Sequence, residues 1–137
     1  MEKDDQAGAK AAIQHFFELW AYAYQSGDVK PLKAVSASGC KFCAAAVKAA
    51  LADAERGEHT VGSEISLDGA TYLGTAYGNY QAFDITITQG AWQVISTSGE
   101  VTDEEPKPYV FDARIAVGLQ GSAWLVRAVD IADEDER

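Results

Sequence analysis

The chain has two cysteines, Cys40 and Cys43, and their spacing allows three kinds of chemistry. In the first turn of a helix, Cα atoms three residues apart are separated by about 5.5 Å, which suits a disulfide. The pair could also be a redox centre whose thiolate is stabilised at the helix N-terminus, or half of a zinc site. Against a redox centre, the cysteines follow a predicted helix, whereas thioredoxin-like motifs follow a strand. A structural disulfide would close a short loop, contribute about 2 kcal/mol and fit an oxidising compartment.

Other motifs for metal binding or catalysis do not occur in the sequence. Zinc needs about four ligands, and the histidines are His15, which we expect to be buried in a helix, and His59, in a turn. The sequence contains no Gly-x-Ser-x-Gly nucleophile motif, Walker loop, Gly-x-Gly-x-x-Gly or His-Glu-x-x-His. We therefore expect no metal, no cofactor and no catalytic residue.

Two aspartates, Asp84 and Asp112, would be candidate acids or bases if they faced a pocket. In the strands expected around them, apolar residues alternate with these aspartates. If the apolar faces cover the helices, both aspartates point away, toward solvent or toward Arg114 on the neighbouring strand. The direction of Arg127 stays open, because both faces of its strand are apolar.

Aromatic residues are concentrated in the first predicted helix. A curved sheet leaves a hollow under such a helix, which either side chains or a ligand must fill. The pocket candidates are Phe16, Trp20 and Tyr24 from the helix and Phe83 and Phe111 from the sheet. Packing of the same residues in a core is the alternative.

Three helices are expected to precede the strands. The first begins after a cap at Asp4 or Asp5, and Ser26-Gly27 ends it. A short second helix follows Asp28, with Pro31 in its first turn. The third covers residues 40–56, is rich in alanine and ends at Gly57.

The second half of the chain has the composition and turn signals of a sheet. We expect strands at residues 61–67, 70–77, 80–89, 91–99, 109–119 and 122–131, with the first two forming one strand if Asp68-Gly69 is a bulge. Short connections require antiparallel pairing. The predicted fold class is α+β, with N-terminal helices packed on a curved antiparallel sheet.

Length and charge limit the classes of function. The 137 residues suit one domain over 1–137, with short flexible acidic ends at about 1–6 and 132–137. A formal net charge of -10 excludes nucleic acid as a partner, because it repels phosphate backbones. The chain has no apolar stretch long enough for a signal peptide or a membrane span.

The aromatic helix, the long sheet and the Gly-x-x-Trp-x-Val strand from Gly121 to Val126 resemble the nuclear transport factor 2-like, cystatin-like cone superfamily. More closely, the run FFELWAYAYQSGD at 16–28 and the run SGCKFC at 38–43 resemble an actinobacterial family of uncharacterised domains, predicted to be lipoproteins. The similarity covers about residues 9–131. It implies a cone fold and an extracytoplasmic domain on the cell surface, tethered by an upstream lipid anchor that this chain lacks. A cytoplasmic location is the alternative.

These observations favour a non-catalytic domain that binds a small molecule or a protein partner and contacts the membrane only through that anchor. Two other functions stay open. One is a cone-fold enzyme of isomerase or dehydratase type that uses Tyr24 and a carboxylate, and the other is a thiol redox module with Cys40 and Cys43. Whether the domain forms a homodimer through the exposed face of its sheet stays open.

Overall fold

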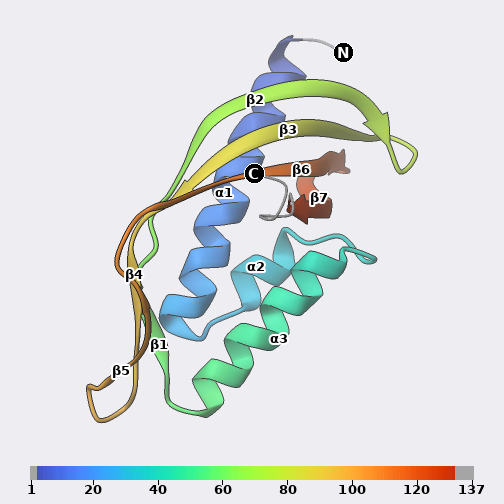
Figure 1. The fold of residues 1–137 in the computed structure, drawn as a ribbon. Coiled ribbons are helices and arrows are strands. Elements are labelled where there is room, and N and C mark those ends of the chain that lie inside the picture. The colour runs from blue at the N-terminus through green and yellow to red at the C-terminus, as the bar shows by residue number, and fades with distance from the viewer. Residues whose placement is uncertain (1–2, 132–137) are drawn as a thin grey trace.

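The computed structural model describes residues 3–131, in which three helices precede seven strands (Figure 1). The helices are α1 (Lys3–Ser26), α2 (Lys30–Ala34) and α3 (Lys41–Glu55). The strands are β1 (His59–Gly62), β2 (Ile65–Ala76), β3 (Tyr80–Gln89), β4 (Trp92–Ile95), β5 (Val101–Glu105), β6 (Tyr109–Gln120) and β7 (Ala123–Ile131). Residues 3–6, expected to belong to a flexible end, are helical; the expected ends at 1–2 and 132–137 lie outside the described residues.

The ends of the helices follow the capping signals in the sequence, with two differences. Helix α1 already includes Asp4 and Asp5, so neither is its cap. Val29, not Asp28, is the N-cap residue of α2, but Asp28 Oδ1 accepts a hydrogen bond from the backbone N–H of Lys30 at 3.1 Å. Helix α3 ends where expected, because Gly57 adopts a left-handed conformation with φ 74° that glycine tolerates best.

The strands form two antiparallel sheets. The large sheet has the order β2-β3-β6-β7, and β2 has the expected bulge between Leu67 and Gly69. The first expected strand, 61–67, is divided, because residues 61–62 belong to β1 in the other sheet and β2 begins at Ile65. The small sheet has the order β1-β4-β5. Strand β5 is absent from the sequence-based prediction. Backbone hydrogen bonds from Ser63 N to Ala91 O at 3.0 Å and from Gly90 N to Glu64 O at 2.7 Å connect the two sheets.

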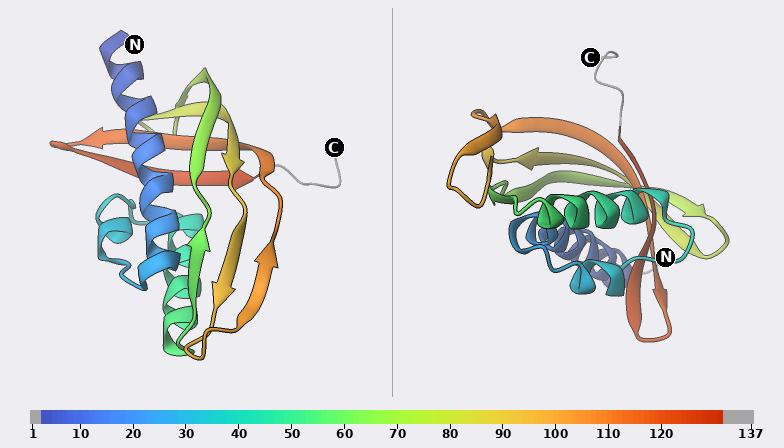
Figure 2. Two further views of the ribbon diagram at one scale, coloured as in Figure 1. Left: turned by 90° about the vertical axis from the view of Figure 1, so that its left-hand side faces the viewer. Right: turned by 90° about the horizontal axis from the view of Figure 1, so that it is seen from below.

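The strands curve around α1, and the helices lie on the concave side of the sheet (Figure 2). The expected apolar wall is buried: Phe83 lies opposite Ile115, and Ile87 lies opposite Phe111, in the register of β3 and β6. Against this wall α1 packs Ile13 and the neighbouring apolar residues of its inner face. The architecture is therefore the α+β cone that the resemblance implies.

Arg127, whose direction the sequence left open, connects three separate segments. Its guanidinium carbon lies 4.4 Å from the centre of the Tyr77 ring, at the turn between β2 and β3. Its Nη1 donates to the Gly39 carbonyl oxygen at 2.9 Å, just before α3. Arg127, on β7, thus joins the loop before the cysteines to the turn between β2 and β3.

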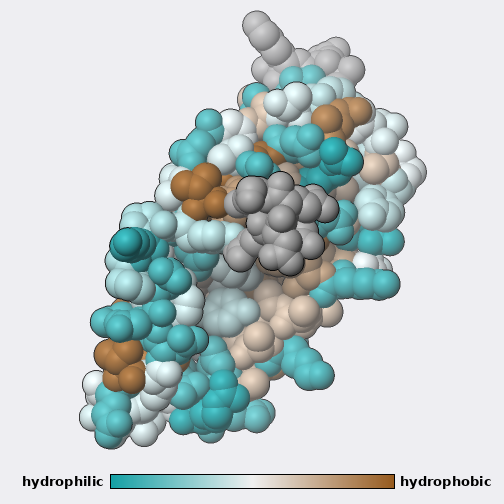
Figure 3. All heavy atoms as spheres, in the orientation of Figure 1, coloured by the Kyte–Doolittle hydropathy of each residue, from teal (hydrophilic) through white to brown (hydrophobic). Residues whose placement is uncertain are grey.

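Within the part of the chain that the structure describes, no helix has the length and apolar character needed to cross a bilayer. The face of the molecule shown in Figure 3 is mainly hydrophilic, with apolar residues scattered singly. Scattered apolar residues of this kind are ordinary on protein surfaces.

Candidate functional site

A pocket of about 220 Å³ lies where the C-terminal parts of α1 and α3 meet the small sheet. We call it the inner pocket. Its lining comes from both helices, from strands β1, β3, β4 and β5, and from the turn after β1: Trp20, Tyr24, Asp53, Thr60, Ser63, Gln89, Trp92, Val94 and Asp103. The hydrogen bond from Gln25 Nε2 to the Gly62 carbonyl oxygen, at 2.8 Å, holds the end of α1 against β1.

Three of these residues are aromatic. Trp20 and Tyr24 are one helical turn apart on α1, and their ring centres lie 5.6 Å apart in an edge-to-face arrangement. Trp20 also contacts the buried Phe17 edge to face, with a centre separation of 6.2 Å. Trp92 is the first residue of β4 and lines the pocket from the sheet. All three pocket aromatics are half-buried, so part of each ring faces the space.

The turn after β1 gives the pocket one buried hydroxyl, that of Ser63. Gly62 has φ 85°, and a Cβ there would lie 2.3 Å from the Ala91 carbonyl oxygen, so only glycine fits. Ser63 is also left-handed, at φ 68°, which is uncommon for a residue other than glycine. In this conformation its Oγ is buried and accepts a hydrogen bond from Gln89 Nε2 at 2.8 Å.

Thr60 supplies a second hydroxyl. The residue is 8% exposed and lies on the inward face of β1. Its side chain belongs to the lining of the inner pocket. A threonine hydroxyl on a pocket wall can donate a hydrogen bond to a bound molecule or accept one from it.

The charged groups of the pocket are acidic. Asp53, in the last turn of α3, forms an ion pair with Arg56, whose guanidinium also contacts Glu58 at 3.0 Å. Burial raises the pKa of the Tyr24 phenol, and the nearby Asp53 charge raises it further. Tyr24 therefore stays protonated at neutral pH, close to a carboxylate.

The pocket candidates from the sequence separate into two groups. Trp20 and Tyr24 line the inner pocket, whereas Phe16, Phe83 and Phe111 do not and are buried in the core. The expectation is wrong for these three phenylalanines because the hollow under α1 is filled. Phe17 and Phe42 pack against Phe16 there, with ring centres 5.1 and 6.3 Å away. The space that remains lies further along α1, toward its C-terminus.

Seven of the nine lining residues were missed in the sequence, and three of them show why. Trp92 falls in a predicted strand, where nothing marked it as different from other apolar residues. Asp53 is one of two acidic residues in an alanine-rich helix, and Asp103 lies in the unpredicted strand β5. The one available signal was Asp53, an acidic residue in the last turn of an alanine-rich helix.

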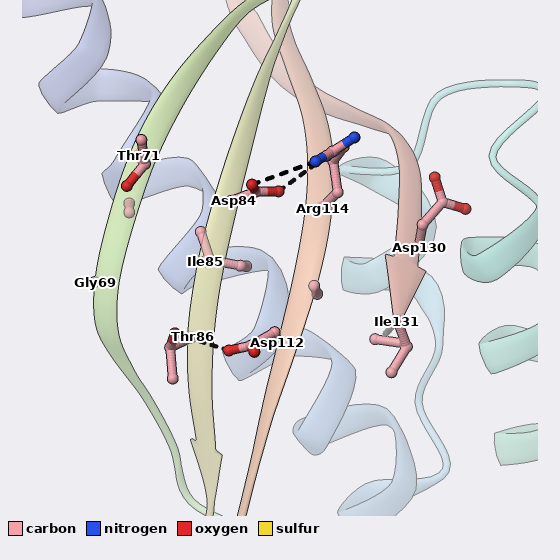
Figure 4. A pocket seen from close by; sticks show the side chains of 11 residues that line it. Gly69, Thr71, Asp84, Ile85, Thr86, Asp112, Arg114, Asp130 and Ile131 are labelled. Atoms are coloured by element: carbon pink, nitrogen blue, oxygen red, sulfur yellow. Dashed lines mark hydrogen bonds and ion pairs between the residues drawn. The ribbon is translucent and has the colours of Figure 1, made fainter. Parts of the chain in front are cut away.

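A second hollow, of about 590 Å³, lies on the outer face of the large sheet (Figure 4). Arg114 Nε donates to Asp84 Oδ1 at 2.9 Å, and Thr86 Oγ1 donates to Asp112 Oδ1 at 2.9 Å. Both aspartates are exposed and face away from the helices, which confirms the alternation read from the sequence. Each aspartate therefore pairs with a side chain on the neighbouring strand.

Cys40 and Cys43 form a disulfide at the start of α3, with Cα atoms 5.3 Å apart. Cys40 is the N-cap residue, and its sulfur accepts a hydrogen bond from the backbone N–H of Cys43. The two residues are 3% and 2% exposed, so the bond lies in the core, away from the inner pocket. The expectation for His15 is wrong: it lies on the outer side of α1 and is exposed, because the inner side is occupied by apolar residues.

The chain belongs to a family of unknown function, DUF6318, whose family model matches residues 1–130. Among curated proteins, none matches the chain. Solved structures with a similar fold include the intermembrane space region of the chloroplast protein ARC6, which is 12% identical with a TM-score of 0.70 over 98% of this chain and 100% of that one.

Two bacterial structures are also similar. Aln2 from a Streptomyces species is 17% identical, with a TM-score of 0.56 over 93% of this chain and 91% of its own. A protein from Catenulispora acidiphila is 11% identical, with a TM-score of 0.58 over 96% and 95%. At these identities, the similarities show a shared fold and not a shared function.

Proposed function

We propose that this DUF6318 member is a non-catalytic binding domain that acts outside the cytoplasm and holds a small ligand in the inner pocket. The observation that carries the proposal is the composition of that pocket, in which half-buried aromatic rings surround a few polar groups. Its volume of about 220 Å³ is below the roughly 300–1,000 Å³ typical of sites for drug-sized molecules. The ligand is accordingly small, or is one end of a larger molecule.

An enzyme of isomerase or dehydratase type is the second candidate, because Tyr24 and Asp53 lie in the same pocket. Their properties favour binding over catalysis. The raised pKa of Tyr24 makes its phenol a weaker acid than usual, which is the wrong direction for proton transfer near neutral pH. Arg56 holds Asp53 Oδ1, so the carboxylate is oriented by an ion pair.

A thiol redox function receives less support from the position of the disulfide. Redox-active cysteines are partly exposed and lie in electropositive surroundings. Here both residues are buried in the core cluster. A buried disulfide does fit a domain that folds in an oxidising compartment, which is one reason to place this domain outside the cytoplasm.

The cell-surface lipid anchor is part of the proposal and rests on the sequence resemblance. Metabolic labelling of the natural protein in its own cells with an alkyne fatty acid tests it. Covalent incorporation of the label is expected. A natural protein that remains unlabelled, or that is found in the cytoplasm with free thiols, would contradict this part of the proposal.

Ligand binding is tested with a panel of neutral, anionic and cationic small molecules, observed by ¹H–¹⁵N NMR. We expect at least one compound to shift the indole N–H signals of Trp20 and Trp92. Thr60→Trp fills the pocket and should abolish the shifts, whereas Thr71→Trp, on the outer face, should leave them. If no compound shifts these signals in the wild-type protein, the inner pocket is not a ligand site and the proposal fails.

A further inference from the structure

We infer that the ligand of the inner pocket carries a small organic cation, such as a quaternary ammonium or a protonated amine. The inference rests on the proposed binding function and adds the chemical class of the ligand. Two features of the pocket support it: its aromatic rings and the sign of its charges.

Aromatic rings attract cations because the face of each ring carries a negative quadrupole. Tryptophan is the strongest of the three aromatic residue types in this respect, and tyrosine also contributes. The inner pocket has two tryptophans and one tyrosine, from two different elements, in a space of about 220 Å³. Rings grouped in this way are the usual means of binding alkylated ammonium groups, which are too weakly hydrated to resist transfer from water.

The charged residues of the lining are both acidic, Asp53 and Asp103, and none of the lining residues is a lysine or an arginine. The nearby Arg56 is paired with two carboxylates, those of Asp53 and Glu58, so the group as a whole remains negative. The pocket also lies beside the C-terminal ends of α1 and α3, where helix dipoles place partial negative charge. These fields favour a cation and oppose an anion such as a carboxylate or phosphate.

Thr60 provides a specific polar contact next to the rings. Its hydroxyl can accept a hydrogen bond from a protonated amine, or bond to a hydroxyl on the ligand. Such a contact distinguishes a cation with a polar substituent from a purely apolar one. Choline combines a quaternary ammonium with a hydroxyl, and its neutral isostere 3,3-dimethylbutan-1-ol has the same shape without the charge.

The test compares these two compounds as probes, by NMR titration of the wild-type chain. Choline should bind about tenfold more tightly than 3,3-dimethylbutan-1-ol, which is the ratio that a cation–π site of this size would give. Asp103→Asn and Trp92→Leu should each weaken choline binding several-fold. Asp112→Asn makes the same charge change on the outer face and should leave the affinity for choline unchanged.

The outcomes separate this inference from the proposed function. If the neutral isostere binds as well as choline, or if only neutral or anionic compounds shift the pocket signals, the cation preference is wrong and the binding function stands. Equal weakening by Asp103→Asn and Asp112→Asn also overturns the inference, because it indicates a general charge effect. If neither probe and no compound of the wider panel binds, the binding function itself fails.

Discussion

Tyr24 is the residue whose titration reports most directly on the inner pocket. Its pKa is raised above the ordinary value near 10, first by burial and second by the charge of Asp53. A raised pKa means that the folded state binds the proton more tightly than the unfolded state. This difference contributes to the unfolding free energy. The contribution is fully present below about pH 10 and is lost as the pH rises through the folded-state pKa of Tyr24.

Tyr24→Phe removes this titration, so the variant should lose less stability than the wild type between about pH 9 and pH 11. Urea unfolding at several pH values measures the difference. Tyr22→Phe is the matched control, because Tyr22 lies on the same helix and is 41% exposed. If both variants follow the wild-type profile, Tyr24 is not held in the environment described here.

Phe17 packs in the core and Trp20 lines the pocket, so truncating each residue compares the stability that the two environments contribute on one helix. Phe17 is 1% exposed, so Phe17→Ala opens a cavity and should cost about 3–5 kcal/mol of unfolding free energy. Trp20 borders a space that already exists, and Trp20→Ala should cost only about 1–2 kcal/mol. Urea denaturation of the two variants checks the order. A larger loss for Trp20→Ala would mean that the indole is part of the core.

At the scale of the elements, the sequence-based predictions succeed where a periodic apolar pattern is long. Helix α1 and strands β3 and β6 bury one face each, so their residue types repeat with the period of the element. Strand β5 was missed because all five of its residues, Val101 to Glu105, are exposed. Its pairing with β4 depends on backbone hydrogen bonds, which leave no mark on the side-chain pattern.

The inner pocket was predicted only in part for a related reason. Trp20 and Tyr24 could be found because they lie on the strongly patterned helix α1. Asp53 lies near the end of α3 and Asp103 in the middle of β5, and nothing in the local sequence places either residue beside α1. Ser63 enters the lining through a left-handed conformation that it shares with Gly62, and the sequence-based prediction did not identify this conformation.

The disulfide at the start of α3 should have a modest, purely structural effect. Its oxidised form should be about 2 Da lighter than the reduced protein by intact mass measurement. Replacing both cysteines by alanine should lower the unfolding free energy by about 2 kcal/mol or less, because the closed loop is short. Choline titration of the same variant should be unchanged. Loss of binding in a stable, folded variant would give the cysteines a direct role.

For the whole molecule, the formal net charge of -10 adds a long-range effect to the local field of the pocket. A strongly acidic protein attracts small cations and raises their concentration near its surface. The attraction is screened by salt, whereas contacts inside the half-buried pocket are screened less. Selectivity for a cation should therefore persist at high ionic strength, although association becomes slower.

The same charge would oppose a homodimer formed through the outer face of the large sheet. That face carries Asp84, Asp112 and Asp130 around one cation, Arg114, so two copies would bring like charges together. Dimerisation should therefore strengthen from about 0.02 M to about 0.5 M salt, because screening reduces the repulsion. Sedimentation velocity at the two salt concentrations measures this change.

A charge reversal locates the surface of that dimer. Asp112→Lys removes repulsion on the outer face and should allow dimers to form at low salt. Glu100→Lys makes the same change in net charge at the exposed turn before β5, away from this face, and should behave as the wild type. If the two variants dimerise equally, the effect comes from net charge and the outer face is not the interface. A chain that is monomeric under every condition contradicts the dimer itself.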